Sequence, residues 1–236
     1  MGVADNLARI KERIGSAPVR LVAVTKNIGP REIEEAWRSG VTEFGENRVQ
    51  DALAKQRQLA PAVQNHVNWH FIGHLQTNKA KKVVGEFVLI HSVDSLRLAE
   101  ELSRQSLLAG VVQPVLLQIK VVSEDTKFGF TPDELKGQFW QIYRLPALKV
   151  EGLMTMAPFG ASAGALKHCF TGLKLLKDEL EREFGVRLRE LSMGMSNDYT
   201  EAIACGATLI RLGRAVFKTG NQDSPEFLGA DKQSRH

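Results

Sequence analysis

Short apolar runs alternate along this chain with longer segments in which apolar residues recur every three or four positions. The short runs are rich in aliphatic and β-branched residues, which is typical of buried strands, and the longer segments are typical of helices packed on one face. Eight strands are expected, at Val19–Thr25, Val41–Asn47, Asn68–Leu75, Phe87–Val93, Gln113–Val121, Val150–Met156, Glu190–Ser196 and Leu209–Phe217. A repeated strand–helix order predicts an α/β protein with a parallel sheet.

About eight strands in 236 residues predict a single TIM-type (β/α)8 barrel. We expect the barrel to span residues 1–220, with an amphipathic N-terminal helix, and residues 221–236 to form a polar, flexible tail. An open doubly wound sheet is the alternative. That fold usually begins with a glycine-rich turn, whereas the first turn here, Thr25–Gly29, has no GxGxxG pattern.

Composition narrows the classes of function. The chain has a net charge of +4, but its basic residues are interspersed with acidic ones, so a nucleic-acid partner is not expected. A basic pocket for a phosphorylated small molecule fits equally well. The two cysteines, Cys169 and Cys205, have no metal-type spacing and indicate a reducing compartment. No signal peptide or membrane span is expected, and we predict a cytoplasmic protein.

The first candidate for chemistry is Lys26, at the end of the first expected strand. In a barrel, functional groups gather where strands end, and a partly desolvated lysine there has a lowered pKa. A neutral amine can form an imine with an aldehyde. The alternative is that Lys26 only leads the chain out of the sheet. Other polar residues that follow strands are Asn47, His74, Gln76, Asn78, Asp94, Ser196 and Asn197.

The last two strands predict a phosphate site. A helix is expected to begin at or near Ser196, where unsatisfied N–H groups can bind an anion. Arg211 interrupts an apolar strand and needs a partner, and Gly213 permits close approach of a ligand to the backbone. The loops after strands seven and eight bind phosphate in many barrels. An ordinary helix cap is the alternative for Ser196.

Three further segments allow more than one interpretation. His70 alternates with apolar residues, which favours a hydrogen-bonded core histidine, whereas His74 is expected near the mouth; neither has metal-ligand spacing, so no metal is predicted. The Lys127–Gly129 loop is expected to turn the chain. Met154 is expected in the core, although it could also underlie a flat ring.

Seven segments form a recognisable ordered set, spread over about nine-tenths of the chain: Val22–Lys26, Phe44–Asn47, His70–Lys79, His91–Ser95, Gly152–Met156, Leu191–Asp198 and Ile210–Gly213. Together they resemble the YggS/PROSC family of pyridoxal phosphate homeostasis proteins. The resemblance implies a barrel like the N-terminal domain of alanine racemase, of the type called fold type III among pyridoxal phosphate proteins.

The resemblance also implies roles for individual residues. It implies that pyridoxal 5'-phosphate is the cofactor and is carried as a Schiff base on Lys26, with Arg211 facing the pyridine nitrogen. Ser196, Gly213 and Arg214 would hold the phosphate, and Asn47 and Met154 would line the ring. Four residues depart from the family's usual pattern, namely Arg48, Lys120, Arg214 and Lys218. Arg214 excludes a side-chain hydroxyl contact to the phosphate at that position.

We therefore expect a pyridoxal phosphate-binding protein of cofactor and amino-acid/keto-acid homeostasis, without catalytic residues. We expect a monomer whose partners are the cofactor and PLP-dependent apoenzymes. The alternatives are a PLP-dependent racemase-like enzyme and a sugar-phosphate aldolase that uses Lys26. Racemisation is not expected, because the chain ends soon after its last strand and has only two tyrosines, Tyr143 and Tyr199, to supply a second acid/base.

Overall fold

The computed structural model describes residues 2–122 and 128–218. Its eight strands are β1 (Arg20–Val24), β2 (Glu43–Glu46), β3 (Asn68–Phe71), β4 (Leu89–Val93), β5 (Gln113–Gln118), β6 (Leu148–Met154), β7 (Glu190–Ser192) and β8 (Leu209–Leu212). Its helices are α1 (Val3–Ile14), α2 (Pro30–Arg38), α3 (Val49–Gln58), α4 (Pro61–Gln64), the 3-10 helix η1 (Thr77–Lys82), α5 (Leu96–Ala109), α6 (Pro132–Tyr143), α7 (Ala163–Phe184), α8 (Tyr199–Ala204) and α9 (Arg214–Phe217).

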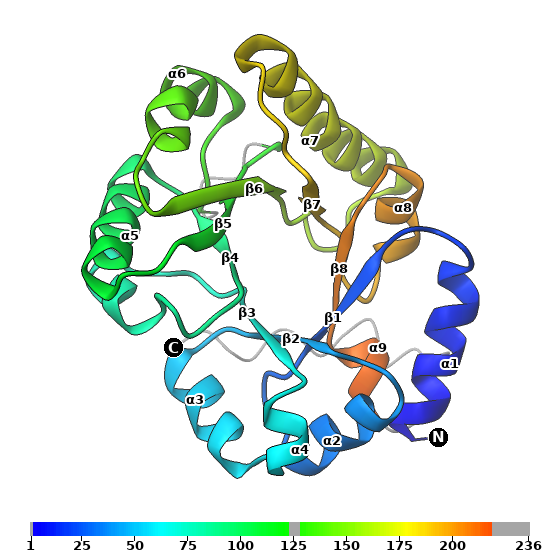
Figure 1. Cartoon of the computed structure of the whole chain (residues 1–236). Helices are drawn as coiled ribbons and strands as arrows, with labels where there is room; N and C mark the ends of the chain where they lie inside the picture. The colour runs from blue at the N-terminus through cyan, green and yellow to red at the C-terminus, as the bar shows by residue number, and fades with distance from the viewer. Residues whose placement is uncertain (1, 123–127, 219–236) are drawn as a thin grey trace.

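The strands form a closed parallel barrel in sequence order, and the longer helices surround it (Figure 1). Closure is seen at Val22, which pairs with Glu43 on β2 and with Arg211 on β8. This confirms the predicted barrel and rules out the open sheet. The expected tail and the Lys127 position lie outside the described residues.

Most predicted strands are confirmed over shorter ranges than the apolar runs that predicted them, whereas β6 keeps the predicted length but begins and ends two residues earlier. The last run, Leu209–Phe217, was expected to be one strand, and this is wrong: β8 ends at Leu212 and α9 begins at Arg214. Gly213 lies between them with φ −104° and ψ −77°. Because helix and strand residues are equally buried here, apolar character could not locate the boundary.

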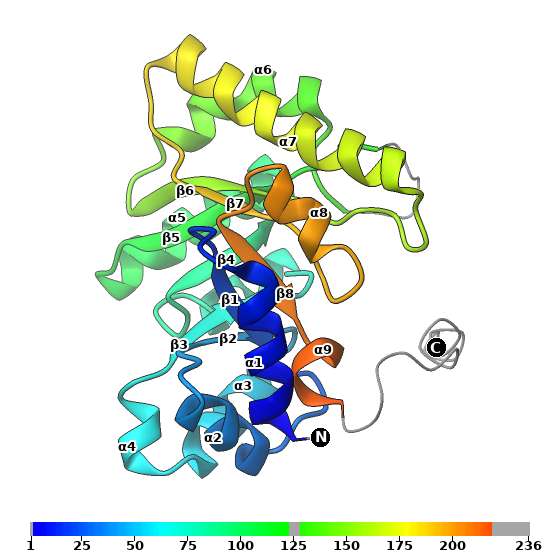
Figure 2. The ribbon, with the colours of Figure 1, turned by 90° about the vertical axis from the view of Figure 1, so that its right-hand side faces the viewer.

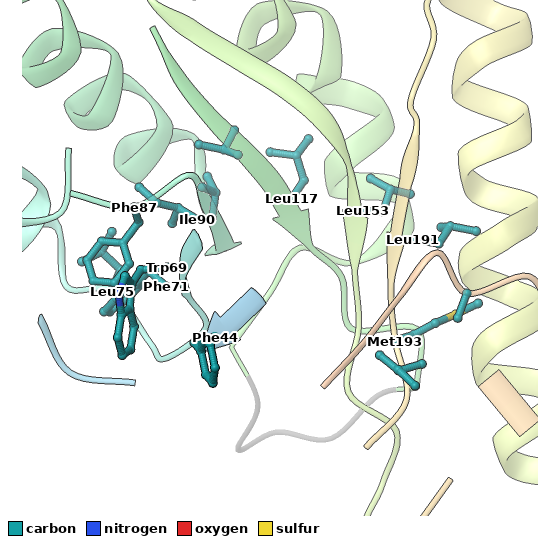
Figure 3. Close-up of a cluster of buried hydrophobic side chains, with 14 of the residues drawn as sticks. Phe44, Trp69, Phe71, Leu75, Phe87, Ile90, Leu117, Leu153, Leu191 and Met193 are labelled. Carbon is teal, nitrogen blue, oxygen red and sulfur yellow. The ribbon is translucent and has the colours of Figure 1, made fainter. Parts of the chain in front are cut away.

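Alternate strand residues face opposite sides of the barrel wall. The outward residues Ile90, Leu117 and Leu153 belong to the large core between barrel and helices, whose aromatic members include Phe44, Trp69, Phe71 and Phe87 (Figure 3). Their inward neighbours form a separate small cluster inside the barrel, made of Val22, Leu89, Leu116, Met154 and Leu209. The barrel interior is therefore packed, and a ligand has to bind at one of its ends.

The N-terminal helix is confirmed and holds the end of the barrel in place. The buried Asn6 on α1 donates through Nδ2 to the carbonyl oxygens of Val216 and Lys218, each at 3.0 Å. Figure 2 shows α1 running beside β8 and α9. Helix α9, which borders the candidate site, is thus anchored by a residue more than 200 positions earlier in the chain.

Candidate functional site

A cavity of about 810 Å³ opens where strands β1, β7 and β8 end. This is the end of the barrel at which functional groups were expected. Five predicted site residues line it, namely Lys26, Ser196, Arg211, Gly213 and Arg214. They come from three loops that lie far apart in sequence, and barrel closure between β1 and β8 brings them together. The remaining wall includes Pro158–Ala161, Leu166 and Phe217.

Lys26 follows β1 directly and lies in a tight turn. Asn27 has a left-handed backbone with φ 60°, and Ile28 N donates to Thr25 O at 2.9 Å. Asn tolerates this conformation better than most residues. The expected partial burial of Lys26 is not found, because the residue is exposed at the cavity wall. The desolvation that the sequence predicted for Lys26 is therefore not observed, and the residue instead lines the cavity together with other cationic residues.

The strand end that carries Lys26 is fixed by a buried carboxylate. Glu46, at the end of β2, is 1% exposed and accepts from Thr25 Oγ1 at 2.8 Å. Lys55 on α3 donates to both Glu46 Oε1 and Thr25 O. Sequence reasoning did not single out Glu46 or Lys55 as a pair. A carboxylate inside an otherwise buried strand was the signal that could have found them.

The expected helix start near Ser196 is corrected by three residues. Residues 196–198 form a turn, and α8 begins at Tyr199 with Asp198 as its N-cap. Asp198 Oδ1 accepts from Met195 N at 2.5 Å. Burial raises the pKa of the Asp198 carboxyl, although this hydrogen bond and Arg211 act in the opposite direction. Ser196 therefore belongs to the loop before the helix and not to the helix itself.

Ser196 nevertheless contacts the segment that carries Gly213. Its Oγ accepts a hydrogen bond from Ala215 N at 3.2 Å, which joins the loop after β7 to α9. Gly213 packs against Val24 of β1 and would leave an added Cβ atom 3.4 Å from Val24 Cβ, an ordinary contact. Glycine was expected here because it lets a ligand approach the backbone closely. The packing of the protein itself does not require glycine, so that reason applies only to the side that faces the cavity.

Arg211 is held by oxygen atoms of the barrel interior. Its Nη1 donates to Ser192 Oγ at 2.6 Å and its Nη2 to Thr155 O at 3.0 Å. The side chain is 5% exposed, and burial lowers the pKa of the guanidinium to about 10 while Asp198 opposes the shift. The partners that this buried charge requires are thus a hydroxyl and a carbonyl oxygen. Within residues 2–122 and 128–218, no carboxylate forms an ion pair with Arg211.

The charges around the cavity fit a phosphate ester. Of the residues that the structure describes, four cationic ones line it, Lys26, Arg211, Arg214 and Lys218, together with one carboxylate, Asp198. A dianion placed among them gains charge-assisted hydrogen bonds, which are stronger than neutral ones. An aldehyde on the same ligand would meet an amine at Lys26. The described residues therefore suit a ligand that carries both a phosphate and an aldehyde.

Asn47 and Met154 do not line this cavity. Asn47 follows β2, where its N–H donates to Glu46 Oε2 at 2.9 Å, and it borders a second cavity of about 230 Å³. Met154 is 1% exposed and packs in the cluster inside the barrel. The core interpretation of Met154 is thus confirmed, and contact of either residue with a cofactor ring stays a prediction.

The histidines divide as expected. His70 is buried and hydrogen-bonded inside the barrel, to Glu43 and His91. His74 is exposed, pairs with Asp94 through Nδ1 at 3.2 Å, and stacks on Phe128 with ring centroids 3.6 Å apart. In the part of the chain that the structure describes, no cluster of three metal-ligating side chains is found, and no helix is long and apolar enough to cross a membrane.

Comparison with known proteins identifies relatives over nearly the whole chain. Residues 2–220 match the family model described as alanine racemase, N-terminal domain. A protein of Synechocystis sp. named pyridoxal phosphate homeostasis protein is 47% identical over 84% of this chain and 90% of its own length. One from Aquifex aeolicus with the same name is 40% identical over 92% of this chain and 98% of its own length.

Solved structures agree with these relatives. PipY of Synechococcus elongatus, in its structure with PLP bound, is 39% identical to this chain and superposes with a TM-score of 0.85 over 92% of this chain and 100% of PipY. An alanine racemase of Clostridium difficile superposes with a TM-score of 0.75 over 94% of this chain and 58% of the racemase, at 14% identity. That similarity shows the fold alone.

Proposed function

Because this chain belongs to the family of pyridoxal phosphate homeostasis proteins, we propose that its cavity binds pyridoxal 5'-phosphate and that the protein stores and releases this cofactor. The observation that carries the proposal is the gathering of Lys26, Ser196, Arg211, Gly213 and Arg214 around one cavity. Lys26, Ser196, Arg211 and Gly213 were predicted from the residues themselves and Arg214 from the family resemblance, and together they offer an amine and donors for an anion within one cavity. The PLP-bound structure of PipY supports the same ligand class.

Lys26 is proposed as the point of covalent attachment. Its Nζ adds to the cofactor aldehyde, and loss of one water leaves a Schiff base. The amine must be neutral to react, and Lys26 lines the same cavity as Arg211 and Arg214. Thr25, Glu46 and Lys55 fix the strand end behind Lys26 and so keep the amine at the cavity.

The phosphate is proposed to bind at the Ser196 and Gly213–Arg214 side of the cavity. Backbone N–H groups of these loops and the Arg214 side chain provide donors, and the Ser196–Ala215 hydrogen bond holds the two loops together. Arg211, fixed by Ser192 and Thr155, is proposed to face the pyridine nitrogen. The family resemblance alone supports the proposal that Asn47 and Met154 line the ring, because neither residue lines the cavity.

Storage and release follow from the same chemistry. A Schiff base sequesters the reactive aldehyde, and exchange of Lys26 for a second amine frees the cofactor for another protein. We propose that the protein acts in this way in the cytoplasm as a monomer, toward PLP-dependent apoenzymes, and not as an enzyme. Neither Tyr143 nor Tyr199, the two tyrosines of the chain, lines the cavity, so no tyrosine faces Lys26 as a second acid/base.

Titration of the purified protein with pyridoxal 5'-phosphate, followed by visible absorbance, tests the proposal. Wild-type protein should develop the absorbance of a Schiff base, and Lys26→Ala should lose it while keeping weak binding through the phosphate. Lys79→Ala is the control, because Lys79 borders only the smaller cavity. Unchanged absorbance in Lys26→Ala would overturn the attachment site, and absence of any binding by the wild type would overturn the function.

A further inference from the structure

A line of buried polar side chains crosses the inside of the barrel and ends at Arg211. Ser192 Oγ lies 2.6 Å from Arg211 Nη1 and 2.8 Å from His91 Nδ1. His91 Nε2 lies 2.9 Å from His70 Nδ1, and His70 Nε2 lies 2.5 Å from Glu43 Oε2. Ser192, His91 and His70 are each at most 1% exposed. The line runs through four strands, β2, β3, β4 and β7, before it reaches Arg211 on β8.

Only one arrangement of protons satisfies every group in this line. Arg211 can only donate, so Ser192 Oγ accepts from it and its hydroxyl proton is left to donate to His91 Nδ1. His91 then carries its proton on Nε2 and donates to His70 Nδ1. His70 in turn carries its proton on Nε2 and donates to the Glu43 carboxylate. Both histidines are neutral in this arrangement, and every proton points from Arg211 toward Glu43.

The electrostatics of the line agree with this direction. Burial is the largest cause that lowers the pKa of His91 well below its ordinary value, and the charges of Arg211 and Arg20 act in the same direction, so His91 is neutral near pH 7. Burial alone would raise the pKa of the Glu43 carboxyl, but His70, Asn68 and Arg20 outweigh it and the pKa is lowered. Glu43 is thus a carboxylate, and the line connects a negative charge to a buried guanidinium.

The line also explains how Arg211 remains buried and charged. A buried charge is stable when its donors are satisfied, and hydrogen bonds in a chain polarise one another. The Glu43 carboxylate makes the His70 and His91 acceptor nitrogens more basic in turn, which makes Ser192 Oγ a better acceptor for Arg211. If His91 were protonated, both of its nitrogens would donate and the Ser192 hydroxyl would lose its acceptor.

We propose that Glu43, His70, His91 and Ser192 act as positioning residues that fix the Arg211 guanidinium for the pyridine nitrogen of the cofactor. This inference rests on the proposed function, since it assumes that Arg211 faces the cofactor ring. None of the four residues lines the cavity, so each acts through Arg211 and not by contact with the ligand. The recognition of the ring would then depend on a line of residues that reaches Glu43 at the opposite end of the barrel.

The first test uses the ligand-free protein. Nitrogen NMR of the histidine side chains at pH 7 should show both His70 and His91 as neutral rings with the proton on Nε2. In Ser192→Ala, the His91 Nδ1 signal should shift toward that of a ring nitrogen without a hydrogen bond. A protonated His91, or a proton on Nδ1 of either ring, would overturn the proposed chain regardless of whether the protein binds the cofactor.

The second test measures binding and the spectrum of bound pyridoxal 5'-phosphate. Ser192→Ala removes one hydrogen bond to a charged group and should weaken cofactor binding by about tenfold. The variant should also shift the absorbance maximum of the bound cofactor. His91→Leu should also weaken binding and shift the absorbance maximum. His91→Gln keeps one donor and one acceptor and should bind the cofactor nearly as well as the wild type. Ser92→Ala is the matched control, because Ser92 is buried on the same strand as His91 and its hydroxyl has no hydrogen-bond partner among the described residues.

The outcomes separate this inference from the proposed function. If wild-type protein binds the cofactor and Ser192→Ala binds it equally well with the same spectrum, the positioning role is wrong and the function stands. If wild-type protein does not bind the cofactor, the proposed function is wrong, and the histidine signals of the ligand-free protein still decide whether the chain exists.

Discussion

Gly152 on β6 lies so close to β7 that a Cβ atom added to it would stand 1.9 Å from the carbonyl oxygen of Glu190. The contact is with backbone, and the two residues are paired in the barrel ladder. Neither strand can move aside without breaking the pairing that places Ser192 next to Met154. The close approach of these strands therefore depends on the absence of a side chain at residue 152.

Gly152→Ala should destabilise the protein by about 3 kcal/mol or more, the upper part of the range for overpacked cores. Urea denaturation gives the free energy of unfolding. Gly137→Ala on α6 is the matched control, because an added Cβ there meets nothing within 4 Å, and it should stabilise the protein by about 0.5–1 kcal/mol. Equal stability of the two variants would contradict the described packing.

The depressed pKa of His91 predicts that the protein loses stability in mild acid. The unfolded chain takes up a proton at His91 near pH 6.5, whereas the folded protein does not, because burial and the charges of Arg211 and Arg20 oppose it. The free energy of unfolding should therefore fall as the pH drops below about 6.5, by up to about 1.4 kcal/mol per pH unit for this one group.

Urea denaturation between pH 5 and 7.5 measures this slope. His91→Gln cannot take up a proton at this position. Its free energy of unfolding should therefore fall less steeply with decreasing pH than that of the wild type, by the contribution of one histidine. Identical slopes in the two proteins would show that His91 titrates normally in the folded state.

The barrel could be predicted from the sequence because its strands are buried on both sides and therefore appear as apolar runs. The ends of the elements could not be predicted as well. Leu209–Phe217 is mostly apolar, yet a strand ends and a helix begins within it. The start of α8 was misplaced because Ser196 and Asp198 are both good capping residues, and only the turn geometry distinguishes them.

The sequence also indicated some residues of the candidate site and missed others. Lys26 was indicated by its place at a strand end, and Arg211 and Gly213 by a charge and a glycine in the last apolar run; the topology of a barrel brings such positions together. The groups that hold Arg211 could not be found, because Ser192 and His91 are 101 residues apart and meet only across the closed barrel. The exposure of Lys26 likewise depends on how neighbouring loops are placed, which no local pattern encodes.

Phosphate binding should depend more on the backbone at Gly213 than on the Ser196 hydroxyl. Gly213→Leu would put a large side chain beside the cavity and should weaken binding of pyridoxal 5'-phosphate by about 10- to 100-fold, the loss expected for charge-assisted hydrogen bonds. Gly213→Ala fits beside Val24 and should bind nearly as well as the wild type.

Ser196→Ala should have a smaller effect than Gly213→Leu, because Ser196 Oγ is already engaged with Ala215 N. Equilibrium titration of the three variants provides the comparison. Equal and negligible effects of Gly213→Leu and Ser196→Ala would place the phosphate elsewhere.

The cofactor-loaded protein should not racemise alanine to a substantial extent. Racemisation needs an acid/base on each face of the α-carbon. Tyr143 packs against Phe139 and Trp140 on α6, and Tyr199 is 4% exposed on α8, so neither residue faces Lys26 across the cavity. Arg211, which stays charged, also disfavours protonation of the ring nitrogen and weakens the cofactor as an electron sink.

Incubation of the loaded protein with L-alanine, followed by separation of the enantiomers, tests this prediction. Only background amounts of D-alanine are expected, at the same level in wild type and Lys26→Ala. Robust formation of D-alanine that is lost in Lys26→Ala would show that the protein is an enzyme.

The central claim is that Lys26 carries the cofactor, and borohydride reduction of the loaded protein followed by peptide mapping tests it most directly. Reduction makes the Schiff base permanent, so the modified lysine can be identified by mass. We predict that the adduct lies on Lys26 and is absent from Lys26→Ala. An adduct on another lysine, such as Lys79 or Lys127, would contradict the account.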